Sequence, residues 1–585
     1  MTAVLRAEEP SARYLVEVES TRVRGFESLA TSKGGVSRLR ELVLNLAVRG
    51  VLVPQISTEG LAATVLSSAR AARTEDDIGR RARHSASQFG DDTEGGRFEL
   101  PAGWLWVSGA DLYKVVRGVS YEKQQASDVA SAGAMPLLRA NNIQRTLNFD
   151  DAVFVPSSLV AADQVLRAGD YVVCMASGSK GLVGKAAPFV DGPKFTFGAF
   201  CAAIRPYAMT LAPYLGVFLA SPLYRDEVSA ESAGIGINNL KSSTLLSLRM
   251  PLPPLAEQHR IVARVEELMK LCDALEQNGR LADEQHARLT STLFDVLAAS
   301  ESAHALAENW QRVAEHFDLL LDRPGAIDAL EQTILQLAVR GLLVPQEASD
   351  EPASELLERM AAYRRGPLVH RAKSELAAEV DEPACPFAVP AGWAWATWEA
   401  VALQIGDIDH KMPREVADGV PYISPKDFTE GNGIDFAGAK KITETDYEDL
   451  ASKIKPERGD LIYPRYGTIG KVRLVETDLR FLASYSCAII KCLKGYVDPE
   501  YQFIVSISAL IVDQATAATN KTTQPNVGLK SIKSFLFPLP PLAEQQRIVA
   551  RVEELRRLCA DLRQRLTQAR EAQSALADAL VAEFA

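Results

Sequence analysis

The chain is duplicated along almost its whole length, and this duplication limits its possible folds more than any other feature. Three motifs occur twice in the same order, at spacings of 287 to 291 residues. The paired motifs are PLPPLAEQHRIVARVEEL at 251–268 with PLPPLAEQQRIVARVEEL at 538–555, LAVRGVLVPQ at 46–55 with LAVRGLLVPQ at 337–346, and PAGWLW at 101–106 with PAGWAW at 390–395. The period is far too long for a solenoid, so the chain has two equivalent halves, about residues 20–299 and 311–585.

The two halves match at their ends and differ in the middle. The dipeptides Gly169-Asp170 and Gly459-Asp460 form a fourth pair, but the interiors share little beyond scattered Gly, Asp and Lys. A repeated frame around two dissimilar inserts predicts a fixed scaffold that presents two different specificities. A duplication kept for stability alone is the alternative.

The motifs also predict the elements of each half. Leu39, Leu42, Val43 and Leu46 recur with helical spacing, which predicts an amphipathic helix that ends at Gly50. Pro-Ala-Gly-Trp opens a segment of short β-rich runs, expected to be a compact α/β domain with its tryptophans in the core. The expected divisions are 1–97 (helical segment and linker), 98–250 (first α/β domain), 251–346 (central helical region), 347–386 (linker), 387–537 (second α/β domain) and 538–585 (closing helix).

Each half closes with a long helix that follows Pro-Leu-Pro-Pro. The first, taken as 255–299, would be roughly 65 Å long at 1.5 Å per residue. Its apolar positions alternate by four and three, as in a coiled-coil seam, and the second helix repeats them. The alternative is an amphipathic helix packed on its own domain. The seam residues are Ile261, Val265, Leu268, Cys272 and Leu275, repeated as Ile548, Val552, Leu555, Cys559 and Leu562.

Composition excludes several protein classes. No run of 18 apolar residues occurs, and the first residues lack the apolar core of a signal peptide. The seven cysteines include no CxxC pair, so we expect neither a disulfide framework nor a zinc ribbon. We therefore expect the chain to be located in the cytoplasm. The net charge is −11, and neither α/β segment is strongly basic. If DNA is the ligand, a partner is expected to supply part of the phosphate neutralisation.

No catalytic constellation is recognisable, so we expect a non-enzymatic chain. The glycine-rich stretch 177–185 fails as a phosphate-binding loop, because Gly is missing at position 179 and Ala186 replaces the magnesium-binding Ser or Thr. The seven histidines show no metal-binding spacing, and no GxSxG motif or adenine-methyltransferase motif is present. No metal is expected.

The paired motifs resemble the specificity subunit of type I restriction–modification enzymes over residues 20–585. The resemblance implies an α/β (α+β) fold with two target-recognition domains, separated by two long conserved helices that form an antiparallel coiled coil with a pseudo-two-fold repeat. Each domain would recognise one half of a bipartite double-stranded DNA target, and the coiled coil would set the gap between the halves.

The resemblance also implies partners that carry the chemistry. Two methyltransferase subunits would bind S-adenosylmethionine and methylate adenine, and two motor–nuclease subunits would use ATP and magnesium for translocation and cleavage. This chain would hold no cofactor. A coiled-coil scaffold that tethers two partners without sequence-selective DNA binding is the alternative function. A specificity module fused to an enzyme is a third hypothesis, but the two repeats leave no room in the chain for enzyme domains.

Three segments in each α/β domain have side chains suited to base edges or phosphates. The first follows a short strand and contains Arg139, Asn141 and Asn142, with Lys426 as counterpart. The second is the glycine loop, with Ser177, Ser179, Lys180 and Lys185, matched by Arg465, Tyr466, Thr468 and Lys471. The third precedes the closing helix, with Asn238, Asn239 and Lys241, matched by Asn520, Lys521, Gln524, Asn526 and Lys530. Ordinary surface turns and loop caps are the alternative for all three.

Overall fold

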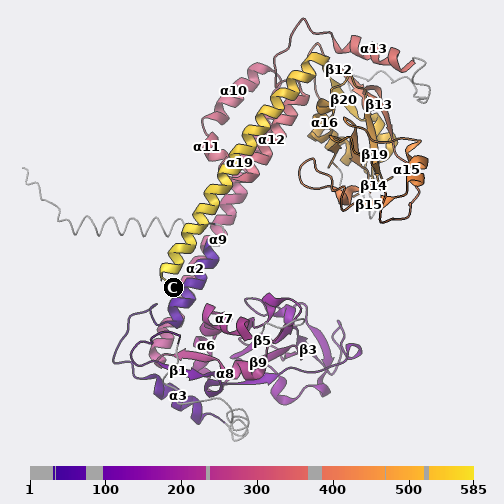
Figure 1. Ribbon diagram of the computed structural model, residues 1–585. Coiled ribbons are helices and arrows are strands. Elements are labelled where there is room, and N and C mark those ends of the chain that lie inside the picture. The colour runs from indigo at the N-terminus through magenta and orange to yellow at the C-terminus, as the bar shows by residue number, and fades with distance from the viewer. Residues whose placement is uncertain are drawn as a thin grey trace, which may run out of the picture. The chain divides into compact units, whose positions relative to one another are not determined.

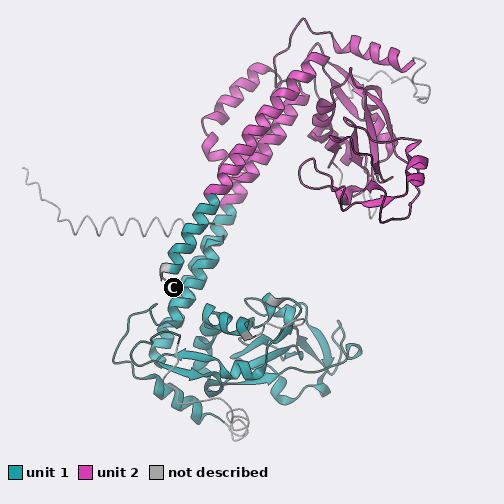
Figure 2. Cartoon of the chain, in the orientation of Figure 1, with its two compact units in different colours: residues 1–281, 570–585 teal, residues 282–569 magenta. Residues whose placement is uncertain are grey.

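The computed structural model describes residues 31–32, 34–73, 97–231, 238–365, 385–467, 470–519 and 526–584. These residues form two compact units (Figure 2). Unit 1 comprises residues 1–281 and 570–585, and unit 2 comprises residues 282–569. Each unit contains one mixed α/β domain and a group of long helices (Figure 1).

Unit 1 opens with α2 (Gly35–Val48), whose buried face includes Leu39, Leu44 and Ala47. Gly50 has a φ of 72° and ends this helix, as the sequence predicts. A Cβ atom at Gly50 would lie 2.5 Å from Cγ of Pro101, so the end of the LAVRG motif packs directly on the PAGW motif. Helix α3 (Ala62–Ala71) then leads toward the α/β domain.

The first α/β domain consists of short sheets that are antiparallel except for the parallel pair β3 and β8. Its main sheet has the order β2-β9-β5-β7, and a second has the order β4-β3-β8. The strands are β1 (Leu105–Ser108), β2 (Tyr113–Arg117), β3 (Ala134–Leu138), β4 (Val153–Pro156), β5 (Asp170–Cys174), β6 (Ala176–Ser177), β7 (Ala186–Phe189), β8 (Thr196–Phe197), β9 (Cys201–Pro206), β10 (Asn238–Asn239) and β11 (Arg249–Leu252). Helices α6 (Ala212–Ala220), α7 (Pro222–Glu231) and α8 (Ser242–Ser247) complete the domain.

The second α/β domain has the same topology, although its sequence differs. Its sheets have the orders β13-β19-β16-β17 and β15-β14-β18, and β12 pairs with β20 as β1 pairs with β11. The strands are β12 (Ala394–Thr397), β13 (Ala402–Gly406), β14 (Val420–Ile423), β15 (Lys440–Ile442), β16 (Leu461–Pro464), β17 (Arg473–Leu474), β18 (Leu482–Ala483), β19 (Cys487–Cys492) and β20 (Leu536–Leu539). The helices are α14 (Trp398–Val401), α15 (Glu444–Ala451), α16 (Pro499–Ile507), α17 (Ala509–Ala517) and α18 (Leu529–Ser534). The duplication therefore extends through the divergent interiors.

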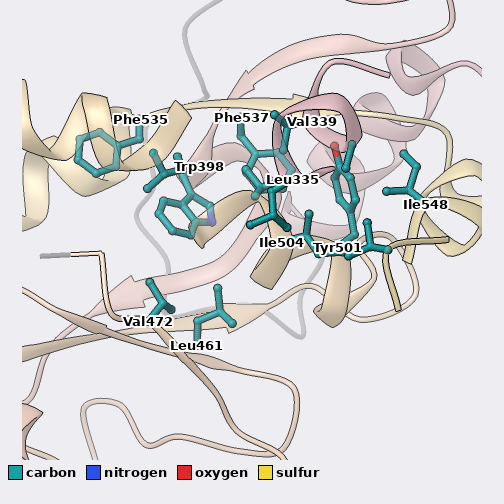
Figure 3. Close-up of a cluster of buried hydrophobic side chains, with 14 of the residues drawn as sticks. Leu335, Val339, Trp398, Leu461, Val472, Tyr501, Ile504, Phe535, Phe537 and Ile548 are labelled. Carbon is teal, nitrogen blue, oxygen red and sulfur yellow. The ribbon is translucent and has the colours of Figure 1, made fainter. Parts of the chain in front are cut away.

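The domain core is continuous with the helices that frame it. In unit 2, Leu335 of α12 (Pro324–Val339) lies in one buried cluster with Tyr501 of α16, Phe537 of β20 and Ile548 of the closing helix (Figure 3). Trp398 is fully buried in the same cluster, where it packs against Tyr463 and Phe535. We call α2 and α12 the opening helices of the two repeats, and the long helix that ends each repeat its closing helix. The apolar face of each opening and closing helix is thus covered by the domain of its own repeat.

The closing helices are α9 (Leu255–Ala298) and α19 (Leu542–Phe584), of 44 and 43 residues. The expected single long helix in each half is confirmed. In unit 1, α2 runs antiparallel to the first part of α9, and the last turns of α19 lie beside them, where Gln573 bonds Thr31 and Arg38 pairs with Asp578. The end of α19 therefore runs antiparallel to α9, as the fold class requires. Among the described residues, no helix is long and apolar enough to cross a membrane.

The apolar seam of the closing helices is shared with a third helix. Ile261 and Val265 pack in the core of the first domain together with α2, and Cys272 contacts Leu39 and Ala577. Leu275, with 37% of its surface exposed, does not join a buried cluster. The seam therefore differs from that of a two-stranded coiled coil, because the opening helix covers its first half.

The second closing helix uses its seam in the same way. Ile548, Val552 and Cys559 lie in the unit 2 core, and Leu555 and Leu562 pack at its margin. The remaining helices of unit 2 are α10 (Ala303–Ala314), α11 (Phe317–Leu320) and α13 (Ala353–Arg365).

The repeated motifs meet at one buried carboxylate in each unit. In unit 1, the indole N–H of Trp104 and the amide of Gln55 donate to Glu257, at 2.9 and 2.6 Å. In unit 2, the amide of Gln346 donates to Glu544 at 2.7 Å, and burial raises the pKa of Glu544 although the hydrogen bond from Gln346 opposes the shift. This joint fixes each domain between its opening and closing helices.

Candidate nucleic-acid interface

Two of the three predicted segments lie side by side in both domains. In the first domain β6 pairs with β10, so that Ser177 is opposite Asn238 and Ala176 is opposite Asn239. In the second domain, Tyr466 and Asn526 form the equivalent antiparallel bridge. The glycine loop and the segment before the closing helix therefore form one polar edge, although about sixty residues separate them in the sequence.

The loop after β3 contains one candidate, Asn142, whose side chain is buried. Asn142 is only 1% exposed; its Oδ1 accepts from the Arg139 backbone N–H and its Nδ2 donates to the Asn148 carbonyl. It holds the turn together, as the loop-cap alternative predicts, and its side-chain amide is not exposed for a base contact in this structure. Asn141 and Arg139 are exposed, with the Arg139 guanidinium 3.2 Å from the Asp151 carbonyl oxygen.

The second domain builds the same turn with a carboxylate. Asp427 takes the position of Asn142 and accepts from the backbone N–H and the hydroxyl of Ser424, at 2.7 and 3.0 Å. Lys426 is exposed at the position of Asn141. The two turns therefore have one geometry but present an amide in one domain and an ammonium group in the other.

The glycine loop of the first domain is an open turn. The hydroxyl of Ser177 accepts from the Ser179 backbone N–H at 3.1 Å, and Ser179 is exposed. Lys180 begins a short 3₁₀ helix, and Lys185 is half-buried. Beside this loop, Asn239 and Lys241 are exposed, while Asn238 lies in β10.

The glycine loop of the second domain contains a structural arginine. Arg465 is 7% exposed and forms a buried ion pair with Asp407, and its Nε donates to the Val527 carbonyl at 3.2 Å. The Val527 N–H in turn donates to the Arg465 carbonyl at 3.0 Å. Arg465 thus joins the two loops, and its guanidinium is held inside the domain by Asp407 and the Val527 carbonyl.

The other candidates of this edge are accessible or lie outside the described residues. Lys471 and Lys530 are exposed, and Tyr466 is half-buried beneath the Arg465 guanidinium, 5.5 Å from the ring centre. The candidates that lie outside the described residues are Thr468, Asn520, Lys521 and Gln524.

Next to this edge lies a pocket that the sequence did not reveal. It has a volume of about 420 Å³ and is lined by β13, by Asp407, by Lys453 and by α18, which contributes Lys530 and Lys533. Lys453 lies 3.6 Å from Asp407 and Lys533 lies 2.9 Å from Glu399, whereas no ion pair among the described residues includes Lys530. Lys453 and Lys533 come from distant segments, so no local motif could have identified the pocket.

The comparisons with known proteins agree with this architecture. A family model described as "Type I restriction modification DNA specificity domain" matches residues 101–283 and 403–571. The first match covers the first α/β domain, the second covers the second domain from β13 onward, and each extends into its closing helix. The chain belongs to this family.

Relatives of this specificity family match across most of the chain. The specificity subunit of the type I restriction enzyme EcoAI from Escherichia coli is 29% identical over 559 residues, covering 93% of each chain. That of EcoEI, also from Escherichia coli, is 29% identical over 580 residues with the same coverage. The crystal structure of the HsdS subunit from Thermoanaerobacter tengcongensis aligns with a TM-score of 0.36 and 16% identity, covering 83% of this chain and 97% of that one.

Three cysteine thiols of the α/β domains are buried in the domain cores. Burial raises the pKa of the Cys201, Cys487 and Cys492 thiols to about 12, so these thiols are protonated at neutral pH. Within the described ranges, no group of three or more His, Cys, Asp or Glu residues is arranged to hold a metal ion. The polar edge and its neighbouring pocket are therefore the candidate site.

Proposed function

We propose that this chain is the DNA-specificity subunit of a type I restriction–modification complex. One observation carries the proposal. The two domains share one topology and are flanked by the same repeated motifs, but their polar edges have different side chains. Each domain recognises one half of a bipartite target, and the closing helices set the gap between the halves.

Within each domain, we propose that exposed polar groups contact bases and that exposed cations contact phosphates. Asn141 and Asn239 carry amides, which suit adenine edges, while Lys426 carries an ammonium group, which suits guanine or a phosphate. The pocket beside the polar edge contributes Lys530, whose charge no carboxylate among the described residues neutralises. A phosphate of the DNA backbone suits this pocket.

We also propose that the chemistry is carried out by partners and that this chain is not catalytic. Two methyltransferase subunits would supply S-adenosylmethionine and adenine methylation, and two motor–nuclease subunits would supply ATP- and magnesium-dependent cleavage, in the cytoplasm. Leu271 and Leu558 support a pair of identical partners, because they occupy equivalent positions on α9 and α19 and are 54% and 59% exposed. One exposed leucine is thus displayed twice, once on each closing helix.

The scaffold alternative predicts no sequence-selective effect on DNA. No observation on the described residues favours it over recognition, and two different polar edges would serve no purpose in a simple tether.

A methylome tests the proposal. The chain is expressed with its neighbouring methyltransferase in a host free of DNA methylation, and modified adenines are mapped by long-read sequencing, with the methyltransferase alone as control. A motif of two short halves with a fixed gap, present only with this chain, is expected. Replacing residues 98–250 by another domain of the family should change one half only. No motif despite confirmed co-expression would contradict the proposal and favour the scaffold.

A further inference from the structure

An ion pair holds each opening helix to the closing helix of its own repeat, and the two ion pairs have opposite polarity. In the first repeat, Arg40 of α2 lies 2.7 Å from Glu276 of α9. In the second, Arg563 of α19 lies 3.3 Å from Glu331 of α12. The spacings of 291 and 287 residues make Arg40 the equivalent of Glu331, and Glu276 the equivalent of Arg563. The positive charge has therefore moved from the opening helix to the closing helix.

The neighbouring residues strengthen this exchange. Arg40 also lies 2.6 Å from Asp273, and the equivalent of Asp273 in the second repeat is Ala560. Arg563 also lies 2.7 Å from Asp328. Each repeat thus places two carboxylates around the arginine of the helix pair, which lies on the opening helix in the first repeat and on the closing helix in the second, and Asp273 also lies 3.0 Å from Arg145 of the first domain.

The remaining contacts between these helices hardly differ between the repeats. Ala47 and Val48 of α2 correspond to Ala338 and Val339 of α12, and the PLPPLAEQ helices share their buried residues. Apolar packing therefore allows an opening helix to dock on either closing helix. Within the paired helices, the exchanged charges distinguish the correct partner from the other repeat, while α2 also packs on α6 and α7, and α12 on α16 and α17, in the divergent domains.

We propose that the exchanged ion pair makes each opening helix select the closing helix of its own repeat. It would reject the closing helix of the other repeat, whether that helix belongs to the same chain or to a second copy of the chain. In the crossed arrangement, Arg40 would face Arg563, and Glu331 would face Glu276. Both contacts place like charges together, and such contacts disfavour a wrong partner. Arg40 has 11% of its side chain exposed, whereas Glu276 has 64% and Arg563 has 35%, so solvent screens this repulsion in part.

The selection has a consequence for assembly. Two chains that exchanged opening helices would form a swapped dimer or an open polymer, which is the general hazard of a repeated, self-complementary interface. The exchanged ion pair counteracts that hazard while the apolar motifs of the two repeats stay the same. The inference concerns pairing of the repeats and does not rest on DNA recognition.

A refolding experiment on the full chain tests the proposal. Two copies with different tags are unfolded together in urea and refolded, and the doubly tagged fraction is measured by sequential affinity capture. The triple variant Arg40→Glu, Asp273→Ala, Glu276→Arg gives the first repeat the charges of the second. Its own-repeat pair still has opposite charges, but the crossed pairs now attract as well. Its doubly tagged fraction should exceed that of the wild type at least about fivefold.

A matched control separates this effect from a general change of charge. Arg264 and Glu267 form an exposed i,i+3 pair along α9, at 2.7 Å, and reversing both charges changes no contact with α2. This control should exchange no more than the wild type. An unchanged doubly tagged fraction in the triple variant, or an equal rise in the control, would overturn the proposal.

A second measurement keeps the proposal testable if the triple variant does not refold. The unfolding midpoints of Arg40→Gln, Glu276→Gln and the double variant form a thermodynamic cycle, and Glu331→Gln with Arg563→Gln forms another. In both cycles the double variant should lose less than the sum of the single losses. Simple additivity in both cycles would show that these charges do not couple the helices, and the proposal would be wrong.

Discussion

Trp104 donates its indole N–H to the buried carboxylate of Glu257, with the two atoms 2.9 Å apart. The two residues belong to different repeated motifs, PAGW and PLPPLAEQ. Gln55, from the third motif, donates to the same carboxylate and to the Gly50 carbonyl. One buried carboxylate therefore joins the opening helix, the α/β domain and the closing helix, and this explains why the three motifs are repeated together.

Removing this carboxylate should destabilise the chain. Glu257→Ala leaves the indole N–H of Trp104 buried without a partner, whereas the Gln55 amide keeps the Gly50 carbonyl, and the loss is expected to lower the free energy of unfolding by about 1–3 kcal/mol. Urea denaturation followed by circular dichroism measures the change. Glu267→Ala, at an exposed position of the same helix, should change stability by less than about 0.5 kcal/mol. Equal effects of the two substitutions would contradict the role of the joint.

The equivalent carboxylate in unit 2 predicts a pH dependence. Burial raises the pKa of Glu544 above its ordinary value of 4.5, so the folded chain holds this proton more tightly than the unfolded chain does. Stability from this group is therefore fully present below the unfolded pKa and is lost as the pH rises through the folded pKa. The wild type should exceed Glu544→Gln in melting temperature most at about pH 4, and the difference should shrink toward pH 7. A difference that grows with pH would contradict the assignment.

The frame of the fold could be predicted from the sequence because its contacts lie within repeated motifs. The helix that Gly50 ends and the uninterrupted closing helices follow from local spacing. The seam was less predictable. Apolar residues spaced alternately by four and three indicate an apolar stripe on a helix, but they do not indicate which helix covers the stripe. In the structure, Cys272 of α9 lies in one buried cluster with Leu39 of α2 and Ala577 of α19.

The candidate site was predictable only in part, because residue type does not report burial. Asn142 and Arg465 have the hydrogen-bonding groups that suit DNA, but both are used inside the domain. The pairing of the glycine loop with the segment before the closing helix depends on a strand contact across about sixty residues. Lys453 and Lys533 belong to no motif, and only folding brings them together.

The turn after β3 allows structure and recognition to be separated with two adjacent asparagines. Asn142→Ala removes both hydrogen bonds of the turn and should lower stability by about 1–3 kcal/mol. Asn141→Ala should leave stability within about 0.5 kcal/mol and change the recognised half-site or weaken its methylation. Melting curves and a methylome for each variant measure the two effects. A methylome unchanged by Asn141→Ala would remove this residue from the recognition surface.

The lysine pocket predicts a salt effect that is independent of sequence. Lys530→Gln should weaken binding of target and non-target DNA equally and reduce the slope of log K against log salt by about 1. Fluorescence anisotropy of the assembled complex at several salt concentrations measures the slope. Lys494→Gln, at an exposed position of the same domain outside the pocket, is the control. A loss confined to target DNA would contradict a phosphate contact.

The equivalent leucines of the closing helices, Leu271 and Leu558, predict that each repeat binds one methyltransferase subunit. Leu271→Glu and Leu558→Glu each place a charge on an exposed position of one closing helix, so neither should change the melting temperature of the chain itself by more than about 2 °C. If each leucine lies in a partner interface, each single variant should retain one methyltransferase subunit and the double variant none, because a buried unpaired carboxylate is costly there. Native mass spectrometry of the co-expressed complex counts the subunits. Glu267→Ala on the same helix is the control, and two bound subunits in the double variant would place the partner surface elsewhere.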